Sequence, residues 1–427
     1  MIISNKLNKM LSSNSQIRKM FEEGNELKKK YGEDKVYDFS LGNPNAKIPT
    51  KLKQTMLEII SEDRADTHRY MSNAGFESTR ASIARHININ FNTSYTYNNF
   101  IMTVGAASAL NIILKSILNE GDEVICFAPY FLEYKTYVEN YNGKLISIDT
   151  SKTDFIPDAK ALEAVITEKT KAILPVHYAG VACNMDKIME IAEKYSLIVI
   201  EDAAQGMMSE YKGKPLGSIA DYGCFSFHET KNYSMGEGGA LLIKDKKNIE
   251  KAEIIREKGT NRSRFFRGQV DKYTWVDKGS SYLPSELNAA YLYGQLENAD
   301  LIYNDRMNSW NKYKVLLQEL ADKNLIELQY IPEDCKHNAH MFYIKCKDLD
   351  ERTLLIDYLK KDQIWAVFHY IPLHSSEAGL KFGRFCGEDK YTTKESERLL
   401  RLPLYYGLKE KEIQLVVSKI KEFYGKK

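Results

Sequence analysis

The sequence predicts an α/β protein with a large, mostly parallel β-sheet and a second, smaller α+β domain. The middle of the chain alternates between short apolar runs and amphipathic helical stretches. These apolar runs are continuous, which is typical of parallel strands that helices cover on both faces. A chain of 427 residues is also too long for one simple core, so it favours two domains.

The expected sheet lies between Phe100 and about Ile243. Its strand candidates are 100–104, 123–127, 144–149, 171–176, 196–202, 221–228 and 239–244. Helical patterns at 106–118 and 184–195 separate some of these runs. Open sheets of this kind bind ligands at the carboxyl ends of their strands, so residues at those ends are the candidates for a functional site.

After about Leu296 the pattern changes to a smaller set of strands and helices. Strands are expected at 325–331, 340–346 and 365–371, and helices at 350–361 and 409–424. The sequence therefore predicts a large domain over 46–295 and a small domain formed by 1–45 and 296–427.

Composition excludes several classes of function. The net charge is only +2, so neither nucleic acid nor an anionic membrane is expected as a partner. No stretch approaches the apolar length of a membrane span, and the first residues contain no apolar core of a secretion signal. The six cysteines form no C-x-x-C pair, so no metal site is expected, and reduced thiols in the cytoplasm fit best.

Lys231 stands between the apolar runs 221–228 and 239–244, and the glycine-rich stretch GEGG leads into the second run. A lysine between two inner strands is costly to bury. It either points into water from a surface turn or serves chemistry at the edge of the sheet. The residues around it leave both interpretations open.

Two other strand ends carry groups that would complement Lys231. The first is the turn at Gly105, where a predicted helix begins with small residues. The N–H groups and the dipole at the start of a helix favour an anion such as phosphate. The second is Asp202, which closes an apolar strand directly after Glu201. Taken alone, the first is also compatible with a tight packing turn and the second with a helix cap.

Together, these three groups suit pyridoxal phosphate. The lysine amine would form a Schiff base with the cofactor aldehyde, and the Asp202 carboxylate would pair with the ring nitrogen and keep it protonated. Desolvation and nearby positive charge lower the pKa of such a lysine and make it a usable nucleophile and base. Lys231 is then tolerated because it is covalently occupied rather than charged.

The chain from about 171 to 427 resembles the DegT/DnrJ-type nucleotide-sugar aminotransferases. The resemblance rests on stretches such as VIEDAAQGMMSEYKGKPLGSIADYGCFSFHETKNYSMGEGGALL, REKGTNRSRFFRGQVDKYTW and GSSYLPSELNAAYL. It is strongest for the branch that aminates TDP-4-keto-6-deoxyglucose in the synthesis of surface polysaccharides. It implies pyridoxal-phosphate fold type I, with the cofactor bound in the large domain.

This resemblance implies a role for each matching residue of the cofactor site. Lys231 would be the catalytic lysine that binds the cofactor and moves protons, and Asp202 would pair with the ring nitrogen. Gln205 would lie against the cofactor ring or its phenolic oxygen, Ser226 would bind the phosphate, and Ser281 would reach the phosphate in the partner subunit.

The same resemblance suggests residues on the substrate side of the site. They are His177, Tyr178, His369, His374 and the arginines of a basic stretch that could meet a diphosphate, Arg262, Arg264 and Arg267. For each histidine the alternative is a hydrogen-bonded structural residue, and for the arginines it is a solvated loop.

The first 150 residues resemble a different branch of the same fold type, the class I amino-acid aminotransferases. The matching stretches include YDFSLGNPN, HRYMSNAGFESTRASIARHI and IMTVGAASALNIILKSILNEGDEVICFAPYFLEY. By this resemblance Gly42 would lie near the substrate carboxylate. The cofactor contacts would be Tyr70 from the partner subunit, Gly105, Ala106 and Ala107 at the phosphate, and Phe131 stacked on the ring. The chain thus resembles two related families joined between about 150 and 171.

The sequence therefore predicts a transaminase that works by two half-reactions. Glutamate would leave its amine on the cofactor, and the cofactor would then aminate a keto carbon of a nucleotide-linked 4-keto-6-deoxy sugar, with Lys231 moving the proton in both. A homodimer is expected because both families complete each site with residues of the partner. The alternatives are a class I amino-acid aminotransferase governed by the N-terminal half, and an inactive or regulatory fusion of two halves.

Overall fold

The computed structural model describes residues 29–30, 50–61, 74–128, 130–131, 133–150, 157–272, 274–369, 372, 389 and 392–425. The chain divides into two compact units. The larger unit comprises 47–305 with 331–340, and the smaller comprises 306–330 with the described residues from 341 onward. Within these described ranges, no helix combines the length and the apolar character that crossing a membrane requires.

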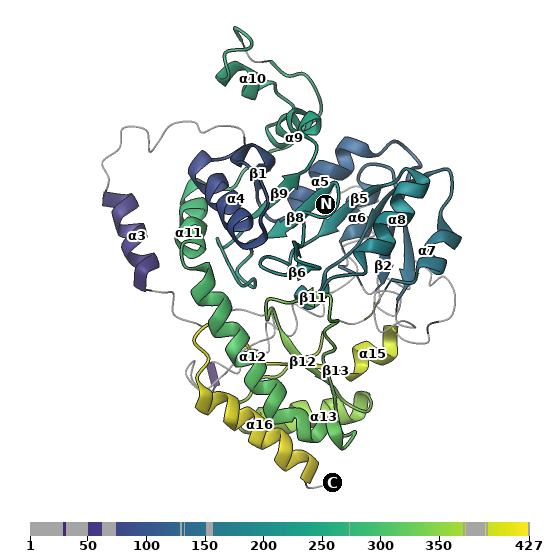
Figure 1. Ribbon diagram of the computed structural model, residues 1–427, viewed down its shortest axis with the longest axis vertical. Helices are drawn as coiled ribbons and strands as arrows, with labels where there is room; N and C mark the ends of the chain where they lie inside the picture. The colour runs from purple at the N-terminus through teal and green to yellow at the C-terminus, as the bar shows by residue number, and fades with distance from the viewer. Residues whose placement is uncertain are drawn as a thin grey trace. The chain divides into compact units, whose positions relative to one another are not determined.

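A seven-stranded sheet forms the centre of the larger unit (Figure 1). In chain order its strands are β1 (Phe100–Thr103), β2 (Glu123–Ala128), β3 (Lys144–Asp149), β4 (Thr170–Leu174), β5 (Ile198–Asp202), β8 (Tyr222–Ser226) and β9 (Gly239–Ile243). In space the order is β1-β9-β8-β5-β4-β2-β3, and β9 runs antiparallel to both of its neighbours while the other pairs are parallel. The predicted α/β fold with a mostly parallel sheet is confirmed.

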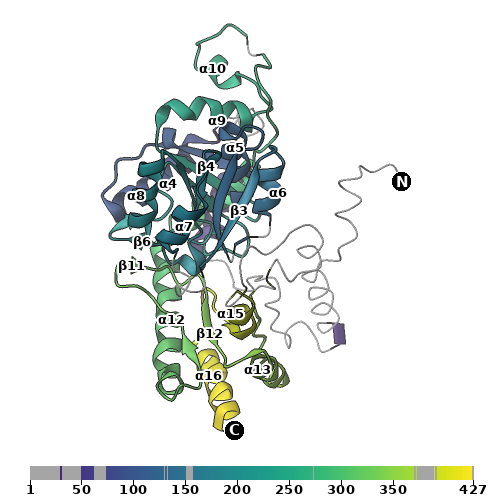
Figure 2. The same ribbon diagram turned by 90° about the vertical axis from the view of Figure 1, so that its right-hand side faces the viewer.

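Helices cover both faces of this sheet, which explains the continuous apolar runs (Figure 2). On β2, Val124 and Cys126 belong to the core on one face, whereas Ile125 and Phe127 belong to the core on the other. Because side chains alternate along a strand, a strand buried on both faces needs apolar residues at every position. The first core includes α5 (Ala106–Ile117), α6 (Tyr134–Glu139) and α9 (Ile249–Arg256), and the second includes α7 (Ala159–Val165) and α8 (Met185–Tyr195).

Several further elements belong to the larger unit. They are the helices α3 (Thr50–Ser61), α4 (Glu77–Phe91), α10 (Arg262–Phe266) and α11 (Glu286–Leu296), the short helices η2 (Tyr97–Asn99), η4 (Tyr178–Gly180) and η5 (Lys246–Asn248), and a small sheet of β6 (Glu210–Tyr211), β7 (Lys214–Pro215) and β11 (Cys335–Lys336). Helix α10 and the loop after it project away from the main sheet in both views (Figure 1, Figure 2).

The smaller unit contains an antiparallel sheet in the order β10-β12-β13. Its elements are β10 (Glu327–Leu328), β12 (Phe342–Lys345), β13 (Leu399–Leu402), α13 (Leu349–Lys361), α15 (Thr392–Arg398), α16 (Glu410–Gly425) and the part of α12 (Ala299–Asp322) that follows residue 305. The predicted strand at 340–346 and both predicted helices are confirmed. The strand expected at 365–371 shows, in its described residues, an isolated bridge between Val367 and Arg401.

Gly223 lies in β8, where the turn at Gly217 packs against the strand. A methyl group added to Gly223 would lie 1.8 Å from the carbonyl oxygen of Gly217 and 2.6 Å from its carbonyl carbon. Because backbone cannot yield as a flexible side chain can, we expect Gly223→Ala to lower the free energy of unfolding by about 1–3 kcal/mol. Urea-induced unfolding followed by circular dichroism would measure this loss.

Gly425→Ala is the matched control, because a methyl group added at the end of α16 has no neighbour within 4 Å. It should change the free energy of unfolding by less than about 0.5 kcal/mol. A Gly223→Ala variant as stable as the wild type would show that the turn at Gly217 can move away from β8 without cost, against this prediction.

Candidate active site

The ends of four neighbouring strands meet at one edge of the seven-stranded sheet. Asp202, at the end of β5, pairs with Cys224 of β8, and β8 ends at Ser226. Ser226 pairs with Gly239, the first residue of β9, and Gly239 pairs with Thr103 at the end of β1. The edge is therefore continuous from β5 to β1, and it is the edge at which open α/β sheets bind ligands.

The turn between β1 and α5 has the geometry of an anion site. Gly105 precedes the helix with a φ of +92°, a conformation that favours glycine. The first N–H groups of a helix have no acceptor within the helix, and the helix dipole favours negative charge there. A methyl group on Gly239 would lie 2.4 Å from the carbonyl carbon of Gly105 and 2.7 Å from the nitrogen of Ala106. The start of β9 therefore packs directly on the turn, which leaves the amides of Ala106 and Ala107 close to the strand that pairs with Ser226.

Lys231 lies in the turn that follows β8 and lines a small cavity. Its N–H donates to the carbonyl oxygen of His228 (2.9 Å), and the N–H of His228 donates to Oγ of Ser226 (3.3 Å). The structure thus brings together Lys231, Ser226 and Gln205, which the sequence places in one cofactor site. The full lining is Ala204, Gln205, Met207, Ser226, Lys231, Asn232, Tyr233, Asn338 and His340.

Two lining residues, Asn338 and His340, come from a segment far along the chain, and the sequence analysis does not single them out. Nδ2 of Asn338 donates to the carbonyl oxygens of Gln205 (2.7 Å) and Met207 (2.8 Å). Nδ2 of Asn232 donates to the carbonyl oxygen of Asn338 (2.8 Å), and Oδ1 of Asn232 lies 3.1 Å from Nδ1 of His340. These bonds fix the segment against the loops on both sides of the cavity. The sequence signal for it is the stretch NAHMFY alone.

Asp202 is buried at the end of β5, and both of its carboxylate oxygens have partners. The N–H of Ala204 donates to Oδ1 (2.8 Å), and the hydroxyl of Tyr134 donates to Oδ2. Burial, and after it the charge of Asp202, raise the pKa of the Tyr134 hydroxyl well above its usual value, so Tyr134 remains a donor. Sequence reasoning misses Tyr134, whose only signal is its place in an aromatic run after β2.

Phe131, which the sequence expects to stack on the cofactor ring, lies beside Tyr134. The two rings meet edge to face with centroids 5.9 Å apart, and Tyr130 stacks on Tyr134 at 6.0 Å. Phe131 is 44% exposed, so part of its ring is open to a ligand. Its stacking on the cofactor stays a prediction.

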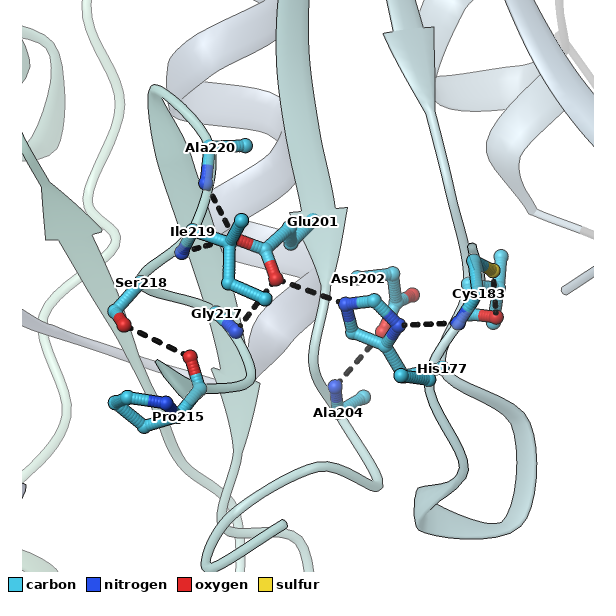
Figure 3. A network of polar contacts seen from close by, with 12 residues as sticks. His177, Cys183, Glu201, Asp202, Ala204, Pro215, Gly217, Ser218, Ile219 and Ala220 are labelled. Carbon is cyan, nitrogen blue, oxygen red and sulfur yellow. Dashed lines mark hydrogen bonds and ion pairs between the residues drawn. The ribbon is translucent and has the colours of Figure 1, made fainter. Parts of the chain in front are cut away.

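Glu201 is fully buried and accepts four hydrogen bonds (Figure 3). Its Oε1 accepts from the N–H groups of Ile219 and Ala220, both at 2.7 Å. Its Oε2 accepts from the N–H of Gly217 (2.8 Å) and lies 2.9 Å from Nε2 of His177. One carboxylate thus ties both the loop at 217–220 and His177, which follows β4, to the end of β5.

His177 has no solvent-exposed surface. The N–H of Cys183 donates to Nδ1 (3.3 Å), and Nε2 donates to the carboxylate of Glu201. Both ring nitrogens are engaged within the protein, and we therefore leave His177 out of the proposed substrate contacts. Tyr178, the next residue, begins η4 and is partly exposed, so it stays a candidate.

Each of the three arginines of the basic stretch pairs with a glutamate. Arg264 binds Glu250 through Nε and Nη2, Arg267 donates to both oxygens of Glu253 (3.1 and 3.0 Å), and Nη1 of Arg262 lies 3.4 Å from Glu257. Ion pairs between exposed groups contribute little to stability, so a diphosphate could displace the outer ones. Binding of a diphosphate by these arginines stays a prediction.

Of the remaining predicted residues, Ser281 is not among those that line this cavity, His369 belongs to the smaller unit, and the others lie outside the described ranges. Ser281 is exposed, and its backbone forms an isolated antiparallel β-bridge with that of Glu257. His369 is buried within the smaller unit. Tyr70, His374 and Gly42 lie outside the residues that the structure describes.

The fold and the site together define a class of protein. A mostly parallel seven-stranded sheet carries at one edge a lysine, a serine, a buried carboxylate and a helix N-terminus suited to phosphate. The chemistry of this donor set fits pyridoxal phosphate, which needs an amine, an anion site and a carboxylate for its ring nitrogen. The architecture is that of pyridoxal-phosphate fold type I.

The chain belongs to the DegT/DnrJ/EryC1/StrS aminotransferase family, whose model matches residues 61–421. An uncharacterized protein of Methanocaldococcus jannaschii is 31% identical over 77% of this chain and 87% of its own length. The UDP-4-amino-4-deoxy-L-arabinose–oxoglutarate aminotransferase of Shewanella sediminis is 27% identical over 75% of this chain and 85% of its own. The chain is therefore an aminotransferase, and its cofactor is pyridoxal phosphate.

A solved structure shows the same fold. PseC of Helicobacter pylori, an aminotransferase involved in the biosynthesis of pseudoaminic acid, superposes with a TM-score of 0.76 at 20% identity, over 90% of this chain and 98% of that one. The family match begins at residue 61, so it also takes in most of the N-terminal stretch that resembles class I enzymes. One family model therefore spans the expected junction between 150 and 171.

We expect Glu201→Gln to destabilise the protein strongly. Each carboxylate oxygen of Glu201 faces two donors, so the amide nitrogen of glutamine would face two N–H groups in either orientation. Leaving buried donors without acceptors should lower the free energy of unfolding by about 2–4 kcal/mol. Chemical denaturation of the cofactor-loaded protein would measure the change.

Glu190→Gln serves as the control, because Glu190 has a side chain that is 67% exposed and pairs with Lys187 on the surface. It should change the free energy of unfolding by less than about 1 kcal/mol. Equal stability of the two variants would mean that the loop at 217–220 does not depend on the buried carboxylate.

Proposed function

We propose that the chain is a nucleotide-sugar aminotransferase that moves the amino group of glutamate to a nucleotide-linked 4-keto-6-deoxy sugar of the TDP-4-keto-6-deoxyglucose type. The observation that carries this proposal is the placement of Lys231, Ser226 and Gln205 around one cavity at the edge of the sheet. Family membership supplies the class of reaction. The name of the Shewanella relative joins a UDP-linked amino sugar to oxoglutarate, which supports both the acceptor class and the donor.

Each residue of the site would hold one part of the cofactor. The amides of Ala106 and Ala107 and the hydroxyl of Ser226 would bind the phosphate, and Asp202 would pair with the protonated ring nitrogen. When bound, the cofactor supplies an aldehyde that takes up the amino group and a ring that accepts the electrons released at the reacting carbon. Nζ of Lys231 would hold the cofactor between turnovers and carry the proton to and from the reacting carbon.

We also propose a homodimer in the cytoplasm, in which each subunit contributes to the partner's site. Ser281 is exposed, and the residue after it, Tyr282, accepts a hydrogen bond from the N–H of Val104 (3.1 Å), directly after β1. A polar side chain exposed beside the phosphate turn is well placed to serve a second copy. Tyr70 stays a candidate for the same contact. A monomer in sedimentation would count against both residues.

The first experiment follows the glutamate half-reaction by absorbance. The protein loaded with pyridoxal phosphate should show the visible band of the lysine-bound cofactor, and glutamate should convert it to the band of the aminated cofactor. Lys231→Ala should slow this conversion by at least about 1000-fold, because it removes both the attachment point and the proton carrier. Lys214→Ala, a change of an exposed lysine in the same unit, should behave like the wild type.

The second experiment supplies the acceptor to the aminated enzyme. TDP-4-keto-6-deoxyglucose should restore the visible band and yield an amino sugar that mass spectrometry detects. Aromatic and aspartate-like 2-oxo acids are the comparison, since they would restore the band in an amino-acid aminotransferase. A cooperatively melting protein in which glutamate causes no conversion would contradict the proposed donor, and a nucleotide sugar that restores nothing would contradict the proposed acceptor.

A further inference from the structure

The contact between Tyr134 and Asp202 joins two parts of the sheet that are not adjacent. Tyr134 is the first residue of α6, which follows β2, whereas Asp202 ends β5. Strand β4 lies between β2 and β5 in the sheet. The phenol therefore reaches over a neighbouring strand to the carboxylate that is proposed to meet the cofactor.

The Tyr134 ring is firmly held. It is 1% exposed and stacks on Tyr130 with an angle of 11° between the ring planes. Tyr137, one turn further along α6, also contacts the ring, with centroids 6.5 Å apart, but its own hydroxyl binds Glu133 instead. Tyr134 and Tyr137 thus share one aromatic cluster and differ in which carboxylate the hydroxyl binds.

The Tyr134 hydroxyl serves Asp202 only as a hydrogen-bond donor. Because it stays protonated, it can donate to the carboxylate but cannot exchange a charge with it. A carboxylate offers about four acceptor positions, and the hydrogen bonds to the Asp202 carboxylate from described residues are those of Tyr134 and Ala204, one on each oxygen. Donors on both oxygens fix the plane of the carboxylate and leave acceptor positions for a further N–H.

We propose that Tyr134 is a positioning residue for Asp202, whose hydroxyl fixes the carboxylate in the plane in which it meets the ring nitrogen of the cofactor. Tyr134 acts through Asp202 and does not touch the reacting atoms. The inference rests on the proposed role of Asp202. Without the hydroxyl, the N–H of Ala204 remains and the carboxylate can turn away from the ring nitrogen.

The test uses the whole protein loaded with pyridoxal phosphate that carries ¹⁵N at its ring nitrogen. The ¹⁵N resonance reports whether that nitrogen is protonated. Tyr134→Phe should move the resonance toward the unprotonated position and slow the glutamate half-reaction about ten-fold, the effect of losing one hydrogen bond to a charged group. Tyr137→Phe, which removes a hydroxyl from the same cluster, should change neither.

The outcomes separate this inference from the proposed role of Asp202. If Tyr134→Phe keeps both the resonance and the rate of the wild type while Asp202→Asn shifts the resonance, Tyr134 is only a packing residue and the inference is overturned. If Asp202→Asn also leaves the resonance unchanged, Asp202 does not meet the ring nitrogen, and both ideas fail. Equal effects of Tyr134→Phe and Tyr137→Phe would also overturn the inference, because they would show a general loosening of the aromatic cluster.

Discussion

The buried carboxylate of Glu201 is the constraint on which the site depends. Moving a carboxylate out of water costs several kcal/mol unless its acceptor positions are filled, so this strand end is stable only with the loop at 217–220 and His177 in place. Adjacent side chains on a strand point to opposite faces. Fixing Glu201 toward the core that contains Ala220 therefore turns Asp202 toward the opposite core, which contains Tyr134.

Glycines at the same edge set how closely the strands and turns approach. A methyl group on Gly239 would meet the backbone of the phosphate turn, and one on Gly217 would lie 2.5 Å from the ring of Phe225. Gly217 also has a φ of +83° and donates its N–H to Glu201. At Gly239 the absence of a side chain lets β9 pack on the turn where an anion would sit, whereas at Gly217 it lets the loop at 217–220 approach Phe225 and bind Glu201.

Much of the fold follows from the sequence because its strands are short apolar runs that are buried on both faces. Lys231, Ser226 and Gln205 could also be predicted to meet, since strand ends of a parallel sheet share one edge. Tyr134, Asn338 and the partner of His177 could not. Their positions depend on how α6 is rotated over the sheet and on how the segment 331–340 packs against loops that are distant in the sequence. No local periodicity of the sequence encodes either arrangement. Strand β13 escapes prediction because it follows α15 directly, with no glycine or proline between them to mark the change from helix to strand.

Glu201 and Asp202 show how two neighbouring carboxylates come to differ. Both are buried and both end the same strand, so burial does not distinguish them. Their hydrogen bonds do. The Glu201 carboxylate accepts four, which fills its capacity, whereas the Asp202 carboxylate accepts two from described residues. A saturated carboxylate can only hold structure. A half-filled one has acceptor positions left, and the protonated ring nitrogen of the proposed cofactor would supply a charge-assisted bond that offsets the cost of keeping it buried.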